Sequence, residues 1–345
     1  MNRTIAFLIF ILLSVSIPSH AKEINYTVNK IWANSEYNSF TSLVKYRNKF
    51  YCAFREGKGH VFDADGKAEG KIRIITSSNG KKWKSICLLG AEGQDFRDPQ
   101  LSITPSGELM VSIGVSIYKD RKLVTHIPHV SYSRDGINFT AAQACTLEGQ
   151  NEHLSDWIWR TTWQEGTGYT VNYFRYKDGK NGLWLMSTRD GLNYKKIHEF
   201  NISDIPTEAT IRFLPDGQMG LMLRRDGKNN NGLWGTCPAP YKDWHFKDIP
   251  FRLGGPDFVV LNDTCIIAGT RSHLNPRWCT TSVFKGNLRS GTFQHILVLP
   301  SGGDTSYPGM ILDGKYLWMS YYSAHESRRP DIYLAKIPLK TLLAF

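Results

Sequence analysis

Three short stretches decide the fold: SSNGKKW at residues 77–83, SRDGINF at residues 133–139 and TRDGLNY at residues 188–194. Each holds a hydroxyl residue, any residue, Asp or Asn, Gly, two further residues and an aromatic residue. Their acidic or amide residues stand at 79, 135 and 190, so the stretches recur after 56 and 55 residues. Asp-Gly and Asn-Gly favour tight turns between strands, because Gly adopts positive φ and the Asp or Asn side chain bonds the nearby backbone. A constant period of this length predicts a repeat built from β-hairpins.

A second repeat runs between these turn stretches. Each unit opens with a short apolar strand, turns at residues such as PSG 105–107 or PDG 215–217, and continues into a second apolar strand. The six expected strand pairs are 40–46 with 50–54, 99–104 with 109–115, 159–163 with 169–174, 209–214 with 219–223, 257–261 with 264–268, and 307–312 with 316–322.

With a third and a fourth strand flanking the turn stretch, each unit has the four strands of a propeller blade. Residues 22–345 hold about 5.9 periods of 55 residues, which predicts an all-β, six-bladed β-propeller. The last unit lacks an outer strand, so we expect residues 26–33 to close the ring as its fourth strand. Helix patterns and low-complexity linkers are nearly absent, and residues 22–345 are therefore expected to form a single domain.

Residues 1–21 are typical of a signal peptide. Arg3 gives a positive start, residues 5–17 are an apolar run of thirteen residues, and residues 19–21 (SHA) are typical of a cleavage site. A membrane span needs about 20 apolar residues. We therefore expect cleavage near Ala21 and export to the periplasm or the extracellular space, without stable membrane insertion.

The chain is basic, with 42 Lys and Arg against 31 Asp and Glu. These residues are spread along the sequence, which favours an acidic glycan as partner over nucleic acid. None of the six cysteines forms a CxxC pair, so no metal site and no cofactor is predicted. Free buried thiols are expected, and Cys265 with Cys279 is the pair to consider if a disulfide forms. We expect a monomer.

Charged and aromatic residues are expected to meet at one mouth of the central channel, where first strands start and second strands end. The guanidinium group pairs with a carboxylate through two hydrogen bonds, so several arginines there predict a site for an anionic sugar. The alternative is a ring of structural ion pairs between blades. The residues at these positions include Phe40, Arg97, Asp98, Trp159, Arg160, Glu208, Asp257, Asp304 and Tyr307 from first strands, and Arg55, Tyr173, Arg224, Arg225, Arg271 and Tyr322 from second strands.

The turn stretches resemble the Asp-box of the sialidase (neuraminidase) superfamily, and a propeller of six units is the sialidase architecture. The segment 206–225, with Glu208 and Arg224, is similar to the sialidase segment that carries the catalytic glutamate and the second arginine of the carboxylate-binding triad. Arg271 stands where the third arginine is expected. Residues 304–307 (DTSY) are similar to the segment that bears the nucleophilic tyrosine, and the resemblance covers nearly all of residues 22–345.

This resemblance implies a secreted glycoside hydrolase, exo-α-sialidase-like, that releases a terminal acidic sugar, with sialic acid favoured. Tyr307 would be the nucleophile and Glu208 its base, since sialidases use a tyrosine in place of a second carboxylate. Arg224 or Arg225, with Arg271, would bind the substrate carboxylate. Further candidates for substrate binding are Arg55, Arg97, Asp98 and Asp304.

The chain departs from the sialidase pattern in two places. The first arginine of the triad is absent from residues 37–41 (YNSFT), and Arg55 could reach the pocket instead. The general acid is expected in the loop 57–70, where His60, Asp63 and Asp65 occur. Two alternatives therefore stay open: a uronic-acid-directed glycosidase or polysaccharide lyase on the same propeller, with His60 or Tyr307 as base, and a glycan-binding propeller without catalysis.

Overall fold

The computed structural model describes residues 25–275 and 277–344. The expected signal peptide, residues 1–21, lies outside the described residues. Within the described ranges the chain is built from β-strands, apart from one short helix, α1 (Leu339–Leu343), and one 3-10 turn at Gln150–Glu152. No helix in these ranges is long and apolar enough to cross a membrane.

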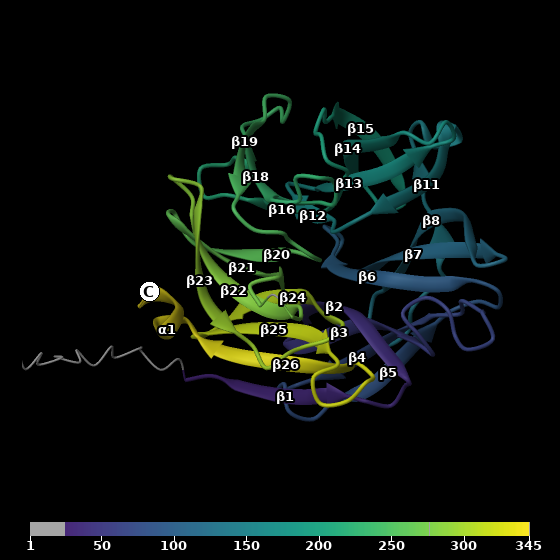
Figure 1. Cartoon of the computed structure of the whole chain (residues 1–345), viewed down its shortest axis with the longest axis horizontal. Coiled ribbons are helices and arrows are strands. Elements are labelled where there is room, and N and C mark those ends of the chain that lie inside the picture. The colour runs from purple at the N-terminus through teal and green to yellow at the C-terminus, as the bar shows by residue number, and fades with distance from the viewer. Residues whose placement is uncertain (1–24, 276, 345) are drawn as a thin grey trace, which may run out of the picture.

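Four separate sheets have the four antiparallel strands of a propeller blade, and they stand around a central axis (Figure 1). The first contains β2 (Tyr37–Tyr46), β3 (Lys49–Gly57), β4 (Lys71–Ser77) and β5 (Lys84–Leu89). The next two contain β16 (Pro206–Phe213), β17 (Met219–Arg225), β18 (Gly232–Cys237) and β19 (His245–Ile249), and β20 (Asp257–Asn262), β21 (Cys265–Ser272), β22 (Thr280–Asn287) and β23 (Thr292–Val298). The last contains β24 (Thr305–Asp313), β25 (Tyr316–Ser323), β26 (Asp331–Pro338) and β1 (Thr27–Trp32).

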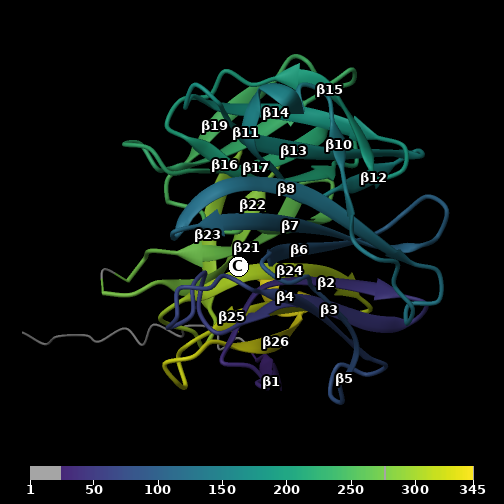
Figure 2. The same ribbon diagram turned by 90° about the vertical axis from the view of Figure 1, so that its right-hand side faces the viewer.

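The other strands form one ten-stranded sheet, so the expected count of six separate blades is wrong. One part of this sheet contains β6 (Asp95–Ile103), β7 (Leu109–Lys119), β8 (Lys122–Ser133) and β9 (Gln143–Ala144). The other contains β10 (Thr146–Leu147), β11 (His153–Ile158), β12 (Thr162–Gln164), β13 (Thr167–Tyr176), β14 (Asn181–Thr188) and β15 (Asn193–Glu199). The two parts are joined because Ser155 of β11 pairs in parallel with His126 of the long strand β8. Figure 2 shows β6, β7 and β8 side by side.

The ring is closed by the two ends of the chain, as predicted for residues 26–33. β1 pairs antiparallel with β26, from Thr27 opposite Lys336 to Trp32 opposite Ile332. In Figure 1 the purple β1 lies against the yellow β26. Apolar side chains fill the space between neighbouring sheets; Ile267 of β21 and Met319 of β25, for example, share one buried cluster.

The three turn stretches are closed by the same side-chain bonds. In the second, the Ser133 hydroxyl accepts the Gly136 N–H at 2.9 Å and the Asp135 carboxylate accepts the Ile137 N–H at 2.8 Å. The expected burial of their three aromatic residues holds for Tyr194, which is 2% exposed. Trp83 and Phe139 are only partly buried.

All six cysteines lie within the described residues and all are free. Four are buried, whereas Cys87 and Cys279 are partly exposed. The pair considered from the sequence does not form. Cys265 starts β21 and lies opposite Asn287, whereas Cys279 precedes the far end of that ladder, where Ser272 pairs with Thr280.

Bulges at the start of four inner strands position side chains at the axis. The pairing register shifts at residues 39–42, 97–100, 206–209 and 306–309. Three of these bulges contain a residue with positive φ: Phe40 at 60°, Asp98 at 49° and Tyr307 at 50°. This conformation costs a non-glycine residue about 1–3 kcal/mol, and such costs concentrate at functional sites. The bulges therefore mark the axial mouth as the place to look for chemistry.

Candidate active site

Tyr307 and Glu208 meet at the axis, as the sequence predicts. The Tyr307 hydroxyl, at the start of β24, donates to Oε1 of Glu208, at the start of β16, at 2.5 Å. Oε2 of Glu208 accepts the backbone N–H of Gly255 at 2.6 Å. Gly255 has a φ of 58°, and a Cβ at this position would lie 2.4 Å from the Tyr307 ring. Only glycine therefore permits this close approach.

The phenol and the carboxylate are both nearly buried, with 8% of Tyr307 and 7% of Glu208 exposed. Burial, followed by the charge of Glu208, raises the pKa of the Tyr307 phenol above its usual value of about 10. The phenol is therefore protonated at neutral pH and needs a base to react. Arg224 Nη1 donates to Glu208 Oε1 at 2.8 Å and to the Tyr307 oxygen at 3.0 Å, so it is placed to stabilise a phenolate.

Arg271 approaches Tyr307 from another side. Its guanidinium carbon lies 5.3 Å from the centre of the Tyr307 ring, and its Nη2 donates to Asp304 Oδ1 at 3.0 Å and to the Tyr322 hydroxyl at 2.9 Å. Among the described residues, Nη1 of Arg271 and Nη2 of Arg224 have no hydrogen-bond partner. Each arginine therefore keeps an N–H group for a ligand.

Asp304 joins His60 and Tyr37 to this cluster. Its Oδ2 accepts a hydrogen bond from the Tyr37 hydroxyl and lies 2.7 Å from Nδ1 of His60. Although burial opposes the effect, His60 and then Arg271 lower the pKa of Asp304 to about 2, so the carboxyl is ionised at neutral pH. The His60 side chain is 49% exposed, which places it on the rim of the site.

Phe40 stands where the resemblance to sialidases led us to expect an arginine. Its ring centre lies 5.1 Å from that of Tyr307 and 5.3 Å from that of His60. The Arg97 guanidinium lies 5.1 Å from the Phe40 ring centre and pairs with Asp98 at 3.0 Å. Burial raises the pKa of Asp98, against the effect of Arg97. Arg97 and Asp98 thus lie beside the Tyr307 cluster, as predicted, but they pair with one another.

Three candidates from the sequence do not reach this cluster. Arg55 is 1% exposed and pairs with Asp95 at 2.7 Å, so it does not replace the missing arginine. Arg225 pairs with Asp248 of β19 at 2.5 Å, because successive residues of a strand face opposite sides and Arg224 faces the axis. Asp65 is exposed and, among the described residues, forms no hydrogen bond or ion pair with the cluster.

Of the candidates for the general acid in loop 57–70, His60 is the one that contacts the cluster. Asp63 instead accepts the Lys67 N–H at 2.8 Å and so holds a turn within the loop. The loop itself is anchored by Arg55, whose Nη1 donates to the Gly59 carbonyl at 2.8 Å.

Several residues of the site were missed in the sequence. Asp226 accepts from Arg224 Nε at 3.0 Å and from Arg252 Nη2 at 2.8 Å, which adds a third arginine to the rim. Burial and then the charge of Arg252 lower the pKa of nearby His273, so this histidine is neutral at pH 7. Arg252 lies in the connection before β20, outside any strand or turn pattern. Its position shortly before an inner strand was the only feature of the sequence that could have indicated a place in the site.

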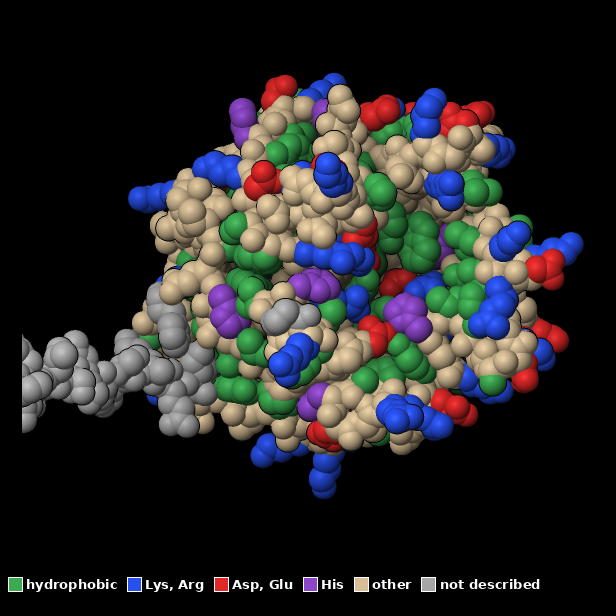
Figure 3. All heavy atoms as spheres, viewed as in Figure 1, with side chains coloured by type: hydrophobic (Ala, Val, Ile, Leu, Met, Phe, Trp, Pro, Cys, Tyr) green, Lys and Arg blue, Asp and Glu red, His purple; other side chains and the backbone are tan. Residues whose placement is uncertain are grey.

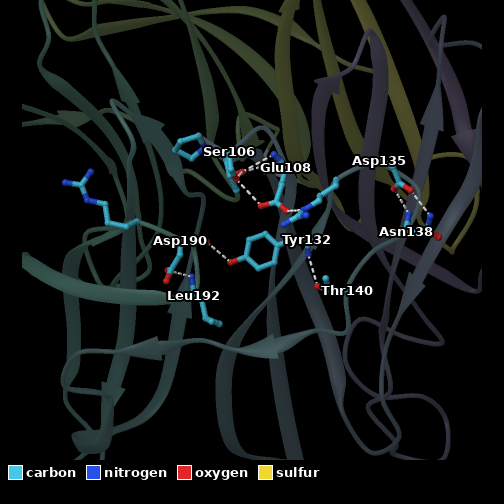
Figure 4. Close-up of a pocket in the computed structure, with 12 residues that line it drawn as sticks. Ser106, Glu108, Tyr132, Asp135, Asn138, Thr140, Asp190 and Leu192 are labelled. Carbon is cyan, nitrogen blue, oxygen red and sulfur yellow. Dashed lines mark hydrogen bonds and ion pairs between the residues drawn. The ribbon is translucent and has the colours of Figure 1, made fainter.

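Figure 3 shows one face of the molecule, with acidic, basic and histidine side chains gathered around a hollow near its centre. One pocket lies elsewhere on the molecule. It has a volume of about 830 Å³ and lies between the turn after β6 and the turn stretches at 133–139 and 188–194 (Figure 4). These turns are at the opposite ends of the strands from Tyr307. Two of its carboxylates, Asp135 and Asp190, bond to the backbone of their own turns, and the third, Glu108, accepts from Arg134 and Ser106. The axial cluster is therefore the better candidate for chemistry.

No family model matches the chain, and no curated protein matches it in sequence. Solved structures match its fold. A protein of unknown function from Dyadobacter fermentans is 16% identical with a TM-score of 0.73, and the match covers 90% of this chain and 99% of that one. Trypanosoma rangeli sialidase is 10% identical with a TM-score of 0.70, over 90% of this chain and 56% of that one. An α-L-arabinanase from Penicillium chrysogenum is 14% identical with a TM-score of 0.69, over 92% and 99%.

At these identities the likeness establishes the fold, an all-β propeller of the kind found in sialidases and in an arabinanase. The chain spans about half the length of the T. rangeli enzyme. The chemistry must therefore be argued from the residues of the axial site.

Proposed function

We propose that the protein is a glycoside hydrolase that releases a terminal acidic sugar, with sialic acid favoured, through a covalent tyrosyl intermediate. The observation that carries this proposal is the Tyr307 hydroxyl 2.5 Å from Glu208, with Arg224 at 3.0 Å from the same oxygen. A carboxylate nucleophile would be repelled by a substrate that carries its own carboxylate. A neutral phenol with a buried base avoids this repulsion, and tyrosine nucleophiles occur in sialidases. The proposed substrate is an acidic glycan.

The substrate carboxylate would be bound by the free N–H groups of Arg224 and Arg271. Charge-assisted bonds of this kind are strong where water is excluded, and both side chains are largely buried, with 15% and 18% exposed. Arg252, held through Asp226, would add to the positive potential at the rim. This two-arginine clamp replaces the three-arginine clamp of the sialidase pattern.

In the first step, the Tyr307 oxygen would bond to the anomeric carbon while the glycosidic C–O bond breaks. The phenol proton passes to Glu208, and His60 gives a proton to the leaving oxygen. Asp304 orients the imidazole through Nδ1, which leaves Nε2 to face the glycosidic oxygen. In the second step, water attacks the anomeric carbon while the bond from this carbon to the Tyr307 oxygen breaks. His60 takes a proton from the water, and Glu208 returns its proton to the Tyr307 oxygen. The site is then in its starting state.

A screen of acidic glycans with product analysis by mass spectrometry tests this proposal. The panel contains sialyl-oligosaccharides and oligosaccharides with terminal uronic acids, each incubated with the wild type and with Tyr307→Phe. Release of the free acidic sugar by the wild type alone supports the hydrolase. Binding of the panel without any product would contradict it and leave a glycan-binding protein. We further propose that residues 1–21 direct export of the protein from the cytoplasm, because such glycans occur outside it.

A second candidate function is a lyase that acts on uronic acids, and one observation favours it. Phe40 stands where the first arginine of the triad is expected, and Arg55 pairs with Asp95 instead of reaching the site. In a lyase, Arg224 and Arg271 would neutralise the carboxylate of the uronic acid, and Tyr307 or His60 would remove the proton next to it. An unsaturated product that absorbs in the ultraviolet distinguishes this reaction from hydrolysis.

A further inference from the structure

Two aromatic side chains lie next to each other beside the Tyr307–Glu208 pair. Trp157 of β11 and Tyr173 of β13 are direct partners across the two strands. Their ring centres are 5.7 Å apart and their planes differ by 15°. Both residues are only partly buried. We call Trp157 and Tyr173 the aromatic platform.

The platform borders the axial site. Tyr173 packs against the buried cluster that contains Tyr307 and Phe40. Burial and then the charges of Glu208 and Asp98 raise the pKa of its phenol. The Arg97 guanidinium lies 5.6 Å from the Trp157 ring centre. In Figure 3 hydrophobic side chains lie along one side of the central hollow.

The Trp157 ring is fixed by a buried histidine of the neighbouring strand β8. The imidazole of His126 stacks on the Trp157 indole, with ring centres 3.4 Å apart and planes within 7°. His126 is 1% exposed, and its Nδ1 lies 2.7 Å from the Ser116 hydroxyl. A Cβ at Gly114 would lie 2.5 Å from the His126 ring, so glycine provides the space for this ring. A platform fixed in this way loses little entropy when a ligand binds.

Two hydrogen-bond donors of the platform are unused. Among the described residues, neither the Trp157 indole N–H nor the Tyr173 hydroxyl has a hydrogen-bond partner. Neither atom is fully buried. Both therefore reach solvent. Ligand sites typically combine aromatic side chains with a few polar groups that fix orientation, and this pair has both properties.

We propose that the aromatic platform binds a neutral sugar ring, namely the residue to which the acidic sugar is joined. This inference rests on the proposed function, which places the acidic sugar at Arg224 and Arg271. The platform itself carries no charge, and the Arg97 guanidinium beside Trp157 already pairs with Asp98. The C–H face of a pyranose would lie on the rings, and its hydroxyl groups would accept from the two free donors.

The position of His60 agrees with this arrangement. His60 contacts Phe40, and the Arg97 side chain lies over Phe40 and over Trp157. On the opposite flank, His60 meets Asp304, which is bonded to Arg271. The proposed acid thus lies between the arginine clamp and the platform. The glycosidic oxygen that joins the two sugars would be placed there.

Neutral disaccharides test the platform without any catalysis. Lactose and cellobiose are titrated into the wild type, Trp157→Leu, Tyr173→Phe and the control Tyr316→Leu, and the Kd is measured by ligand-observed NMR. Tyr316 is an aromatic residue at the start of β25, whereas Tyr322, near the other end of this strand, lies at the axial mouth. We expect Trp157→Leu to raise the Kd about tenfold, Tyr173→Phe to raise it about threefold, and Tyr316→Leu to leave it unchanged. Because Tyr173→Phe keeps the ring, it stays informative if Trp157→Leu folds poorly.

Free sialic acid is the second probe, and it separates the two proposals. Its affinity should fall in Arg271→Gln and stay unchanged in Trp157→Leu. The platform proposal is wrong if neither disaccharide binds the wild type, or if Trp157→Leu weakens sialic acid as much as the neutral sugars. If neutral sugars bind through Trp157 but sialic acid and uronic acids do not bind, the acidic substrate is wrong and the platform stands.

Discussion

Tyr307 is held at the axis by a strained backbone and by contacts to Glu208 and Arg224. Replacing it with Phe removes only the hydroxyl, so the fold should survive while turnover of the acidic glycan falls about 10²-fold or more. Tyr321→Phe is the matched control, because this tyrosine of the adjacent strand β25 is also buried but donates to the Pro300 carbonyl. Steady-state rates and circular dichroism of both variants check the prediction. Full activity of Tyr307→Phe would exclude the tyrosyl intermediate.

The role of His60 as the acid is tested with two substrates whose leaving groups differ in their need for a proton. His60→Asn should slow cleavage of a natural glycan by about 10²-fold or more, since proton donation to the leaving oxygen contributes 10²–10⁴. A 4-nitrophenyl glycoside of the same sugar needs no such proton, and its cleavage should fall less than about tenfold. Asp65→Asn, in the same loop but without a contact to the cluster, should behave as the wild type on both substrates. Equal losses on both substrates would show that His60 is not the acid.

Residue types and spacing were enough to predict Tyr307, Glu208, Arg271 and Asp304 as neighbours, because each stands at the start or end of an inner strand. The same rule could not choose between Arg224 and Arg225. That choice depends on the alternation of the strand, which a bulge changes by one residue. The rule was wrong for Arg55, because a buried partner, Asp95, lies closer to it than the axis does.

At the scale of elements, the short connection at Gly255 decides how near β24 can come to β16. Gly255→Ala should place a methyl group against the Tyr307 ring and weaken the N–H bond to Glu208, so activity should fall about 10²-fold. Gly314→Ala is the control, because Gly314 has the same φ of 58° and open space around it. The positive φ should cost both variants about 1 kcal/mol of stability in thermal unfolding. The contact with Tyr307 should cost Gly255→Ala about 1–3 kcal/mol more, and only this variant should lose activity. Equal activity of the two variants would contradict this role.

The inner strand pairs were predictable because they are apolar runs bounded by turn residues. The expected strand 159–163 is instead divided: β12 starts at Thr162, and β11 ends at Ile158 and pairs with the same partner. The junction between β8 and β11 was not predictable. It rests on the pairing of Ser155 with His126, and no local sequence signal specifies contacts between segments that are distant in the chain.

At the scale of the whole molecule, the site exists only when the ring is closed. Tyr37 and Asp304 are 267 residues apart in sequence, and Glu208 and Tyr307 are 99 apart. The sheet that carries Asp304 and Tyr307 is completed by β1 from the other end of the chain. The N-terminal strand should therefore stabilise the site although it contributes no residue to it.

A chain that begins at residue 33 tests this coupling against a control that begins at residue 25. Removing β1 exposes the edge of β26 and breaks the 3.0 Å ion pair of Lys30 with Asp331. It also removes the nearly buried side chain of Ile31 from the core. Burial of one such aliphatic side chain is worth about 1.5–3 kcal/mol, so the Tm should fall by about 5 °C or more. Calorimetry measures the Tm, and activity measured against temperature should be lost over the same lowered range. An unchanged Tm would mean that the other three strands hold the last sheet on their own. Loss of activity well below an unchanged Tm would mean that β1 acts on the site directly rather than through closure of the ring.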